Sequence, residues 1–118
     1  MYPEENAVST IFGKIINGDI PSSKVFESDT LLVIKDISPK APVHLLLIPK
    51  KEYPSLQEVP KKDLNVVSEI IDVAQSLAEK FGVADNYRLL TNIGTKAGQS
   101  VFHLHFHLIG GKALGPMA

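Results

Sequence analysis

The sequence contains no cysteine and no run of apolar residues long enough to cross a membrane. Without cysteine there are no disulfide bonds and no thiolate chemistry, which fits a protein of a reducing compartment. An excess of charge is also missing, because 12 Lys and Arg residues are balanced by 13 Asp and Glu residues. The formal net charge of −1 gives no basis for bulk electrostatic binding to nucleic acid or to an anionic membrane.

The chain of 118 residues shows no internal repeat, linker or low-complexity segment. Its hydrophobic content of 44% and charged content of 21% are ordinary for a globular protein. We therefore expect a single domain over residues 1–118, with a short polar tail at 1–8 and a C-terminal tail at 112–118. Residues 1–5 are polar and acidic, so we expect no signal peptide and a cytoplasmic location.

The apolar periodicity predicts two helices among several strands. A short helix begins after Ser9, a suitable N-cap, and stops near Gly18. A long helix covers about residues 61–81, where apolar residues recur every three and four positions. Strands are expected at residues 24–27, 31–35, 44–49 and 87–92 and in the histidine-rich segment 99–111. Strands, a helix and then strands without βαβ alternation indicate an α+β fold, with an antiparallel sheet of about five strands.

Three of the four histidines lie within five residues, in the segment 99–111 that reads QSVFHLHFHLIGG. His103, His105 and His107 alternate with apolar residues at the period of a β-strand, so we expect the three imidazoles on one face. Each covered imidazole needs a hydrogen-bond partner. Packing alone is therefore a poor explanation of this row.

Three interpretations of the histidines remain: the polar face of a half-exposed strand, a zinc site, or metal-free chemistry on an anion. The strand runs about 13 Å over four residues, whereas a metal lies within roughly 6.5 Å of the Cα of each histidine ligand. Only two adjacent histidines could then bind one ion, so we expect no metal and no cofactor. Gly98, Gln99 and Ser100 favour metal-free chemistry, because glycine lets the backbone approach a ligand and the other two add side-chain donors.

The pattern HLHFHLI at residues 103–109 resembles the histidine-triad (HIT) superfamily of nucleotide hydrolases. The flanking GQSV at 98–101 and GGK at 110–112 look like its Hint branch, the histidine-triad nucleotide-binding proteins. The resemblance extends from residue 9 to residue 112 and includes DISP at 36–39. It implies the HIT-like fold and a homodimer formed through the long helix and the strand that follows it.

The resemblance also implies an activity. His107 favours hydrolysis, because the nucleotidyltransferase branch of the superfamily carries glutamine at that position. Gly110 and Gly111 argue against the branch that hydrolyses dinucleoside polyphosphates, which stays an alternative. The implied substrate is a purine nucleoside 5′-phosphoramidate, in which an AMP-like or GMP-like nucleotide is joined to an amine. The tail at 112–118 lacks the tryptophan that eukaryotic Hint proteins carry near their C-terminus, which leaves substrate selectivity open.

The resemblance extends to individual residues. The positions that line the nucleobase pocket match Ile11, Phe12, Ile15, Ile34 and Ile37. Asp36 matches an aspartate that binds the ribose hydroxyls, Asn92 a residue near the sugar and phosphate, and His44 a fourth histidine that supports the triad by hydrogen bonding. The residues alone favour other roles: Asp36 as a solvated turn residue or a cap, Asn92 as a turn residue, and His44 as a structural histidine with its hydrogen bonds satisfied.

The chemistry then gives a mechanistic hypothesis. His105 attacks the α-phosphorus through a neutral ring nitrogen, while its other nitrogen donates a proton to a backbone carbonyl. His107, Gln99 and Ser100 stabilise charge on the phosphoryl oxygens, and Ser100 assists the leaving amine. His103 completes the triad, and water cleaves the nucleotidyl-histidine. The remaining alternatives are a nucleotide-binding regulatory module with little turnover and a scaffold that acts through its dimer surface.

Overall fold

The computed structural model describes residues 10–117, so the predicted tail at 1–8 and Ser9 lie outside the described residues. The helices and strands, in chain order, are α1 (Ile11–Ile16), β2 (Lys24–Glu27), β3 (Leu31–Lys35), β4 (Val43–Pro49), α2 (Asn65–Lys80), β5 (Tyr87–Leu90) and β6 (Phe106–Gly110). Three short 3-10 turns lie in the connections, at Leu56–Glu58, Lys61–Asp63 and Thr95–Ala97. Among residues 10–117, no helix has the length and apolar character that a membrane span requires.

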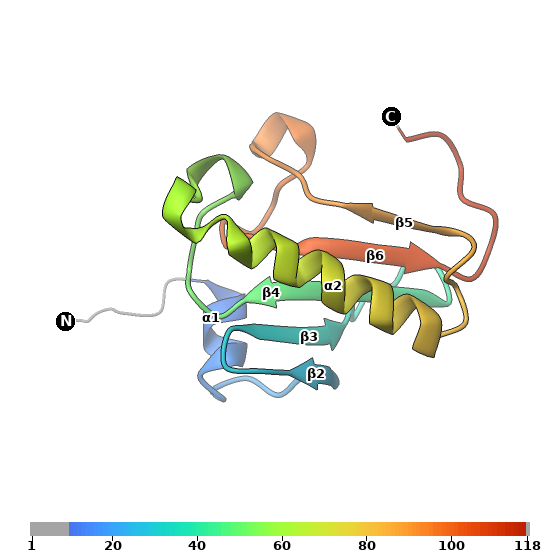
Figure 1. Cartoon of the computed structure of the whole chain (residues 1–118), viewed down its shortest axis with the longest axis horizontal. Helices are drawn as coiled ribbons and strands as arrows, with labels where there is room; N and C mark the ends of the chain where they lie inside the picture. The colour runs from blue at the N-terminus through green and yellow to red at the C-terminus, as the bar shows by residue number, and fades with distance from the viewer. Residues whose placement is uncertain (1–9, 118) are drawn as a thin grey trace.

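The strands form one sheet in the order β2-β3-β4-β6-β5 (Figure 1). All neighbouring strands are antiparallel. The predicted α+β fold, with a five-stranded antiparallel sheet, one long helix and one short helix, is confirmed. In the central pair β4–β6, His44 lies opposite Ile109 and Leu46 opposite His107. Since paired residues project to the same side, these four side chains share one face of the sheet.

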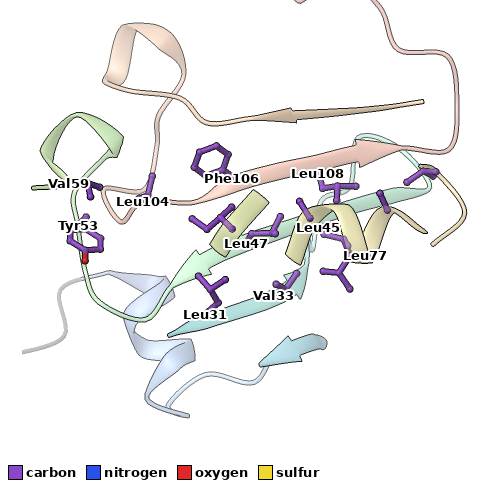
Figure 2. Packing of buried hydrophobic residues seen from close by; sticks show 14 residues of the cluster. Leu31, Val33, Leu45, Leu47, Tyr53, Val59, Leu77, Leu104, Phe106 and Leu108 are labelled. Carbon is purple, nitrogen blue, oxygen red and sulfur yellow. The ribbon is translucent and has the colours of Figure 1, made fainter. Parts of the chain in front are cut away.

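The opposite face of the sheet packs against α2, which crosses it in Figure 1. Five sheet residues of this core are no more than 1% exposed, namely Leu31, Val33, Leu45, Leu47 and Leu108 (Figure 2). The helix contributes Ile70, Ala74, Leu77 and Ala78. This core holds β4 and β6, the strands that carry His44 and His107, in place.

The short helix α1 packs on the other face of β3 and β4, the face that carries His44 and His107. Phe12 and Ile15 pack there against the intervening residues of the two strands, which are Leu32, Ile34, Leu46 and Ile48. β3 and β4 are thus covered on both faces, which explains their continuous apolar sequences. The remainder of this face, over β6 and β5, is only half-buried.

Two element boundaries differ from the prediction. The N-cap of α1 is Thr10, whose hydroxyl oxygen accepts the Gly13 N–H at 3.0 Å, and not Ser9. The long helix begins at Asn65, because the four residues before it form the Lys61–Asp63 3-10 turn and its C-cap. The core stripe of the helix is unaffected by this later start.

Candidate functional site

The three histidines do not share one face of a strand, so that part of the prediction is wrong. β6 begins at Phe106, and of the three only His107 belongs to it. The chain bends before that point, where the Leu104 N–H donates to the Tyr53 carbonyl at 2.6 Å instead of joining the sheet. The bend turns His103 into the protein interior and leaves His105 and His107 half-buried.

His103 is 0% exposed and joins three separate segments of the chain. Its Nε2 lies 2.7 Å from the Pro49 carbonyl, which only accepts, so Nε2 carries the proton and donates it. Nδ1 is therefore an acceptor, and the Thr10 hydroxyl donates to it at 3.1 Å. Because burial lowers its pKa, His103 is neutral. His103 reaches no solvent-facing ligand and acts through its neighbours.

His105 carries the predicted backbone hydrogen bond. Its Nδ1 donates to the His103 carbonyl at 2.7 Å, which fixes the proton on Nδ1 and leaves an unprotonated Nε2. The ring is held from the side by Phe12, edge-on with ring centroids 4.8 Å apart. Burial, above all, lowers the pKa of His105 below its ordinary value, so the ring is neutral near pH 7. A neutral, oriented imidazole with a free lone pair is a nucleophile.

A second series of hydrogen bonds determines which ring nitrogen of His107 carries the proton. The Lys40 N–H donates to His44 Nδ1 at 3.0 Å, so the His44 proton is on Nε2. His44 Nε2 then donates to His107 Nδ1 at 2.9 Å, which places the His107 proton on Nε2. We call this series, from the Lys40 amide through His44 to His107, the histidine relay. It ends in an N–H donor beside His105, with the two rings 5.1 Å apart.

The relay is uncharged at neutral pH. Burial first, and then the neighbouring His105 and His44, lower the pKa of His107, and with the opposing effect of Asp36 included it lies at about 4. Burial also lowers the pKa of His44, which is 6% exposed. His107 can therefore donate a hydrogen bond to an anion without carrying a positive charge.

Asp36, His44 and His107 place possible ligand atoms within 4.8 Å of one another, the arrangement that a metal ion requires. The protonation pattern argues against an ion. Metal binding at His44 Nε2 requires the proton on Nδ1, where it meets the Lys40 N–H. The three groups fit a proton-bearing relay better than a cation site.

The loop before the histidines brings together two predicted residues. Gly98 has φ +105°, a left-handed conformation that favours glycine. A Cβ added to it would lie 3.5 Å from Asn92 Nδ2, so the two residues are in contact range. Ser100 is exposed, and its hydroxyl makes no hydrogen bond within residues 10–117, so it is available to a ligand.

Gln99 differs from the prediction that its side chain donates to phosphoryl oxygens. The residue is 4% exposed, and its Nε2 donates to the carbonyls of Pro54 at 2.6 Å and Val101 at 3.1 Å. Its Oε1 accepts the Gly94 N–H at 2.8 Å. Both amide hydrogens are engaged inside the protein, so Gln99 holds the loop in place.

The predicted base-pocket residues fall into two groups. Phe12, Ile15 and Ile34 are 4–7% exposed and form the packed layer beneath α1. Ile11 is 47% exposed and Ile37 is 94% exposed, so these two present apolar surface to an incoming ligand. A cavity of about 720 Å³ is lined by residues of the α2–β5 connection, β5 and the C-terminal tail, and none of the histidines lines it.

Known proteins are similar to this chain in sequence and fold. The family described as "Scavenger mRNA decapping enzyme C-term binding" matches residues 9–117. A HIT-like protein of Chlamydia pneumoniae is 49% identical over 109 residues, which cover 92% of this chain and 99% of that protein. The chain belongs to the HIT superfamily.

Two further HIT proteins extend the comparison. The purine nucleoside phosphoramidase of Escherichia coli (strain K12) is 44% identical over 112 residues, 94% of each chain. The solved structure of a HIT family hydrolase from Clostridium thermocellum has 42% identity and a TM-score of 0.90, and the match covers 95% of this chain and 98% of that one. The predicted family is thus confirmed along nearly the whole chain.

Sequence reasoning missed several groups that hold the histidine rings and backbone of this HIT site in place. Two are main-chain groups that contact ring nitrogens, namely the Lys40 amide and the Pro49 carbonyl, and a third, the Tyr53 carbonyl, holds the bend at Leu104. No residue type signals a main-chain donor or acceptor, so only the structure reveals them. Thr10 and Thr91 are the two missed side chains; the Thr91 hydroxyl donates to the His105 carbonyl at 2.7 Å.

Proposed function

We propose that this chain is a hydrolase that cleaves the P–N bond of purine nucleoside 5′-phosphoramidates without a metal. The observation that carries the proposal is the 2.7 Å hydrogen bond from His105 Nδ1 to the His103 carbonyl, because it makes Nε2 a fixed, neutral nucleophile. The 44% identity with the E. coli purine nucleoside phosphoramidase supports the choice of substrate. The product is a purine nucleoside monophosphate.

The first half-reaction forms a nucleotidyl-histidine. The lone pair of His105 Nε2 forms a bond to the α-phosphorus while the bond from phosphorus to the amine breaks. The amine nitrogen takes the electron pair of the broken bond and a proton from water, and the exposed Ser100 hydroxyl hydrogen-bonds to the leaving amine. The His107 Nε2–H donates to a phosphoryl oxygen as negative charge develops there.

The second half-reaction returns the histidine. Water attacks phosphorus, the bond from phosphorus to Nε2 breaks, and its electron pair returns to His105 as the water loses a proton. In between, His105 carries a positive charge, because both ring nitrogens are substituted. The His103 carbonyl, which accepts the remaining N–H, stabilises that charge.

Nucleotide binding follows the HIT resemblance. We propose that Asp36 accepts the ribose hydroxyls and that Asn92, Gly98 and Ser100 surround the phosphate. Ile37, with the exposed edge of α1 at Ile11, covers the base. The 94% exposure of Ile37 supports this role, because an apolar side chain left in water gains from covering a flat purine.

We also propose that two copies pair through β5 and α2. β5 ends the sheet order, so one edge of it is unpaired within residues 10–117. Leu64 and Ile71, at the start and on the surface of α2, are 45% and 42% exposed. Light scattering that gives twice the 12.9 kDa chain mass is expected, and a monomer mass at assay concentration contradicts the pairing.

The test of the activity is release of AMP from an adenosine 5′-phosphoramidate, with and without a chelator. His105→Ala removes the nucleophile, so we expect the chemical step to slow by several orders of magnitude. Wild-type activity is expected to survive the chelator, and mass spectrometry of quenched protein is expected to find one added nucleotidyl group on His105.

Three results contradict parts of the proposal. Near-normal turnover by His105→Ala removes the nucleophile assignment. Activity lost to the chelator and restored by zinc contradicts metal-free chemistry. AMP binding without any turnover favours a nucleotide-binding module. AMP affinity measured on His105→Ala serves as the control that the variant is folded.

A further inference from the structure

Asp36 lies beside the histidine relay as well as at the proposed ribose site. Its Oδ2 is 3.4 Å from His44 Nε2, the same nitrogen that donates to His107 Nδ1 at 2.9 Å. The single His44 N–H thus faces two acceptors, one neutral and one anionic. A ribose-binding residue has no need of that second contact.

The carboxylate is held in this position by the protein itself. Asp36 Oδ1 accepts the Ser38 N–H at 2.7 Å, and the Asp36 N–H donates to the His44 carbonyl at 3.0 Å. The side chain of Asp36 is only 18% exposed and that of His44 only 3%. The negative charge therefore faces the histidines whether or not a nucleotide is bound.

We infer that Asp36 is also a positioning residue for the chemical step, because its carboxylate acts through His44 and His107 to stabilise the positive charge that forms on the histidines when His105 bonds to phosphorus. This inference rests on the proposed function and adds a second role to its ribose contact. It predicts that Asp36 contributes to the rate even for a substrate with no hydroxyls to bind.

The electrostatics have the required sign. Asp36 raises the pKa of His44, of His105 and of His107, against the larger effect of burial. A raised pKa means that the positive form is stabilised. The intermediate puts a positive charge on His105, whose ring is 5.1 Å from that of His107, in a half-buried site where charges are weakly screened.

The experiment compares two substrates with the same amine, adenosine 5′-phosphoramidate and its 2′,3′-dideoxy analogue. The proteins are wild type, Asp36→Asn, and Asp29→Asn as a matched control, since Asp29 is an exposed carboxylate in the β2–β3 turn. Asparagine keeps the oxygen that accepts the Ser38 N–H, so the turn is preserved. Rapid-quench single-turnover reactions measure the rate of nucleotidyl-histidine formation under saturating enzyme.

We expect Asp36→Asn to slow that step about tenfold on both substrates, which corresponds to about 1.4 kcal/mol. We expect the dideoxy change to raise KM chiefly in the wild type, and Asp29→Asn to match the wild type throughout. Equal single-turnover rates for Asp36→Asn and wild type on the dideoxy substrate overturn the inference, because Asp36 then acts through ribose alone.

A second measurement needs no turnover. NMR titration of the histidine rings is expected to place the His107 midpoint about one pH unit lower in Asp36→Asn than in the wild type. Lys40 and the neighbouring histidines, which lower the pKa values of the cluster, are unchanged in this variant. An unchanged midpoint overturns the inference, whereas a shifted midpoint in a protein with no hydrolysis on either substrate overturns the proposed function instead.

Discussion

Thr10 makes two hydrogen bonds with one oxygen atom. It accepts the Gly13 N–H as the N-cap of α1, and it donates to His103 Nδ1. The same His103 supplies the carbonyl that orients His105. The start of α1 is therefore connected to His105 through one buried residue, His103, whose ring contacts Thr10 and whose carbonyl contacts His105.

Thr10→Val keeps the shape of this side chain and removes the hydroxyl. The Gly13 N–H and His103 Nδ1 then lose their partner, which we expect to lower the free energy of unfolding by about 1–3 kcal/mol. We also expect a smaller kcat with KM little changed, because the His103 carbonyl is less firmly placed. Urea denaturation and steady-state kinetics at a temperature where the variant is folded give the two values.

Thr10→Ser is the matched control, since it keeps the hydroxyl. Recovery of both stability and kcat in Thr10→Ser is the expected result. A Thr10→Val protein that loses stability at unchanged kcat would show that the residue is only a helix cap.

The role of a residue was predictable from the sequence where the proposed reaction requires that residue to make a particular hydrogen bond. The hydrogen bond from His105 to a backbone carbonyl is such a case, because a neutral nucleophilic imidazole needs its second nitrogen protonated. The inward turn of His103 was not predictable, because the alternation of apolar and histidine residues continues unbroken through Leu104 while the hydrogen bond to Tyr53 ends the strand pattern. Gln99 was misassigned because an amide serves a ligand and a loop carbonyl equally well.

At the scale of elements, the spacing of apolar residues along α2, β3 and β4 allowed the helix and the strands to be predicted. Strands buried on both faces read as continuous apolar runs, and a helix on one face reads as a stripe, so both types were recognisable. Boundaries were less predictable, because the Lys61–Asp63 turn has the same composition as a first helical turn. Strand order was not predictable either, since β6 lies between β4 and β5 and follows both in sequence.

Gly110 ends β6 where the connection from α2 to β5 crosses it. An added Cβ would lie 3.1 Å from Val83 Cβ and 3.2 Å from the Asn86 carbonyl oxygen, both closer than an ordinary contact. We expect Gly110→Ala to lower the free energy of unfolding by about 1–3 kcal/mol through this overpacking. Thermal and urea unfolding measure the change.

Gly115→Ala provides the comparison within the same chain. No heavy atom of the described structure lies within 4 Å of a Cβ added there, so we expect little change in stability. Equal stability of the two alanine variants would contradict the packing that places the α2–β5 connection against the end of β6.

At the scale of the whole molecule, the four histidines make the stability of the fold depend on pH in the same direction. The pKa values of His44, His103, His105 and His107 are all lowered, with burial as the largest cause for each. Below a pH of about 6.5, the unfolded chain therefore binds protons that the folded chain does not. Stability is fully present above that pH and decreases as the pH falls toward the folded-state values.

We expect the free energy of unfolding to decrease between about pH 6.5 and pH 4, by up to about 1.4 kcal/mol per pH unit for each histidine that stays unprotonated in the folded state. Urea denaturation at half-unit pH steps measures this slope. His107→Gln removes one of the four groups and is expected to reduce the slope, whereas a pH-independent stability in this range contradicts neutral buried histidines.

Three main-chain groups fix which nitrogen of each histidine ring is protonated, and this affects how the site tolerates substitutions during evolution. The Lys40 amide and the carbonyls of Pro49 and His103 remain when a side chain is replaced, save that a proline at position 40 would remove the amide. Substitutions of the side chains around the histidines can therefore alter how the base, sugar and amine fit. The orientation and protonation of His105 are preserved, because the backbone sets them. Related proteins can thus evolve to accept new leaving groups while His105 Nε2 stays the nucleophile.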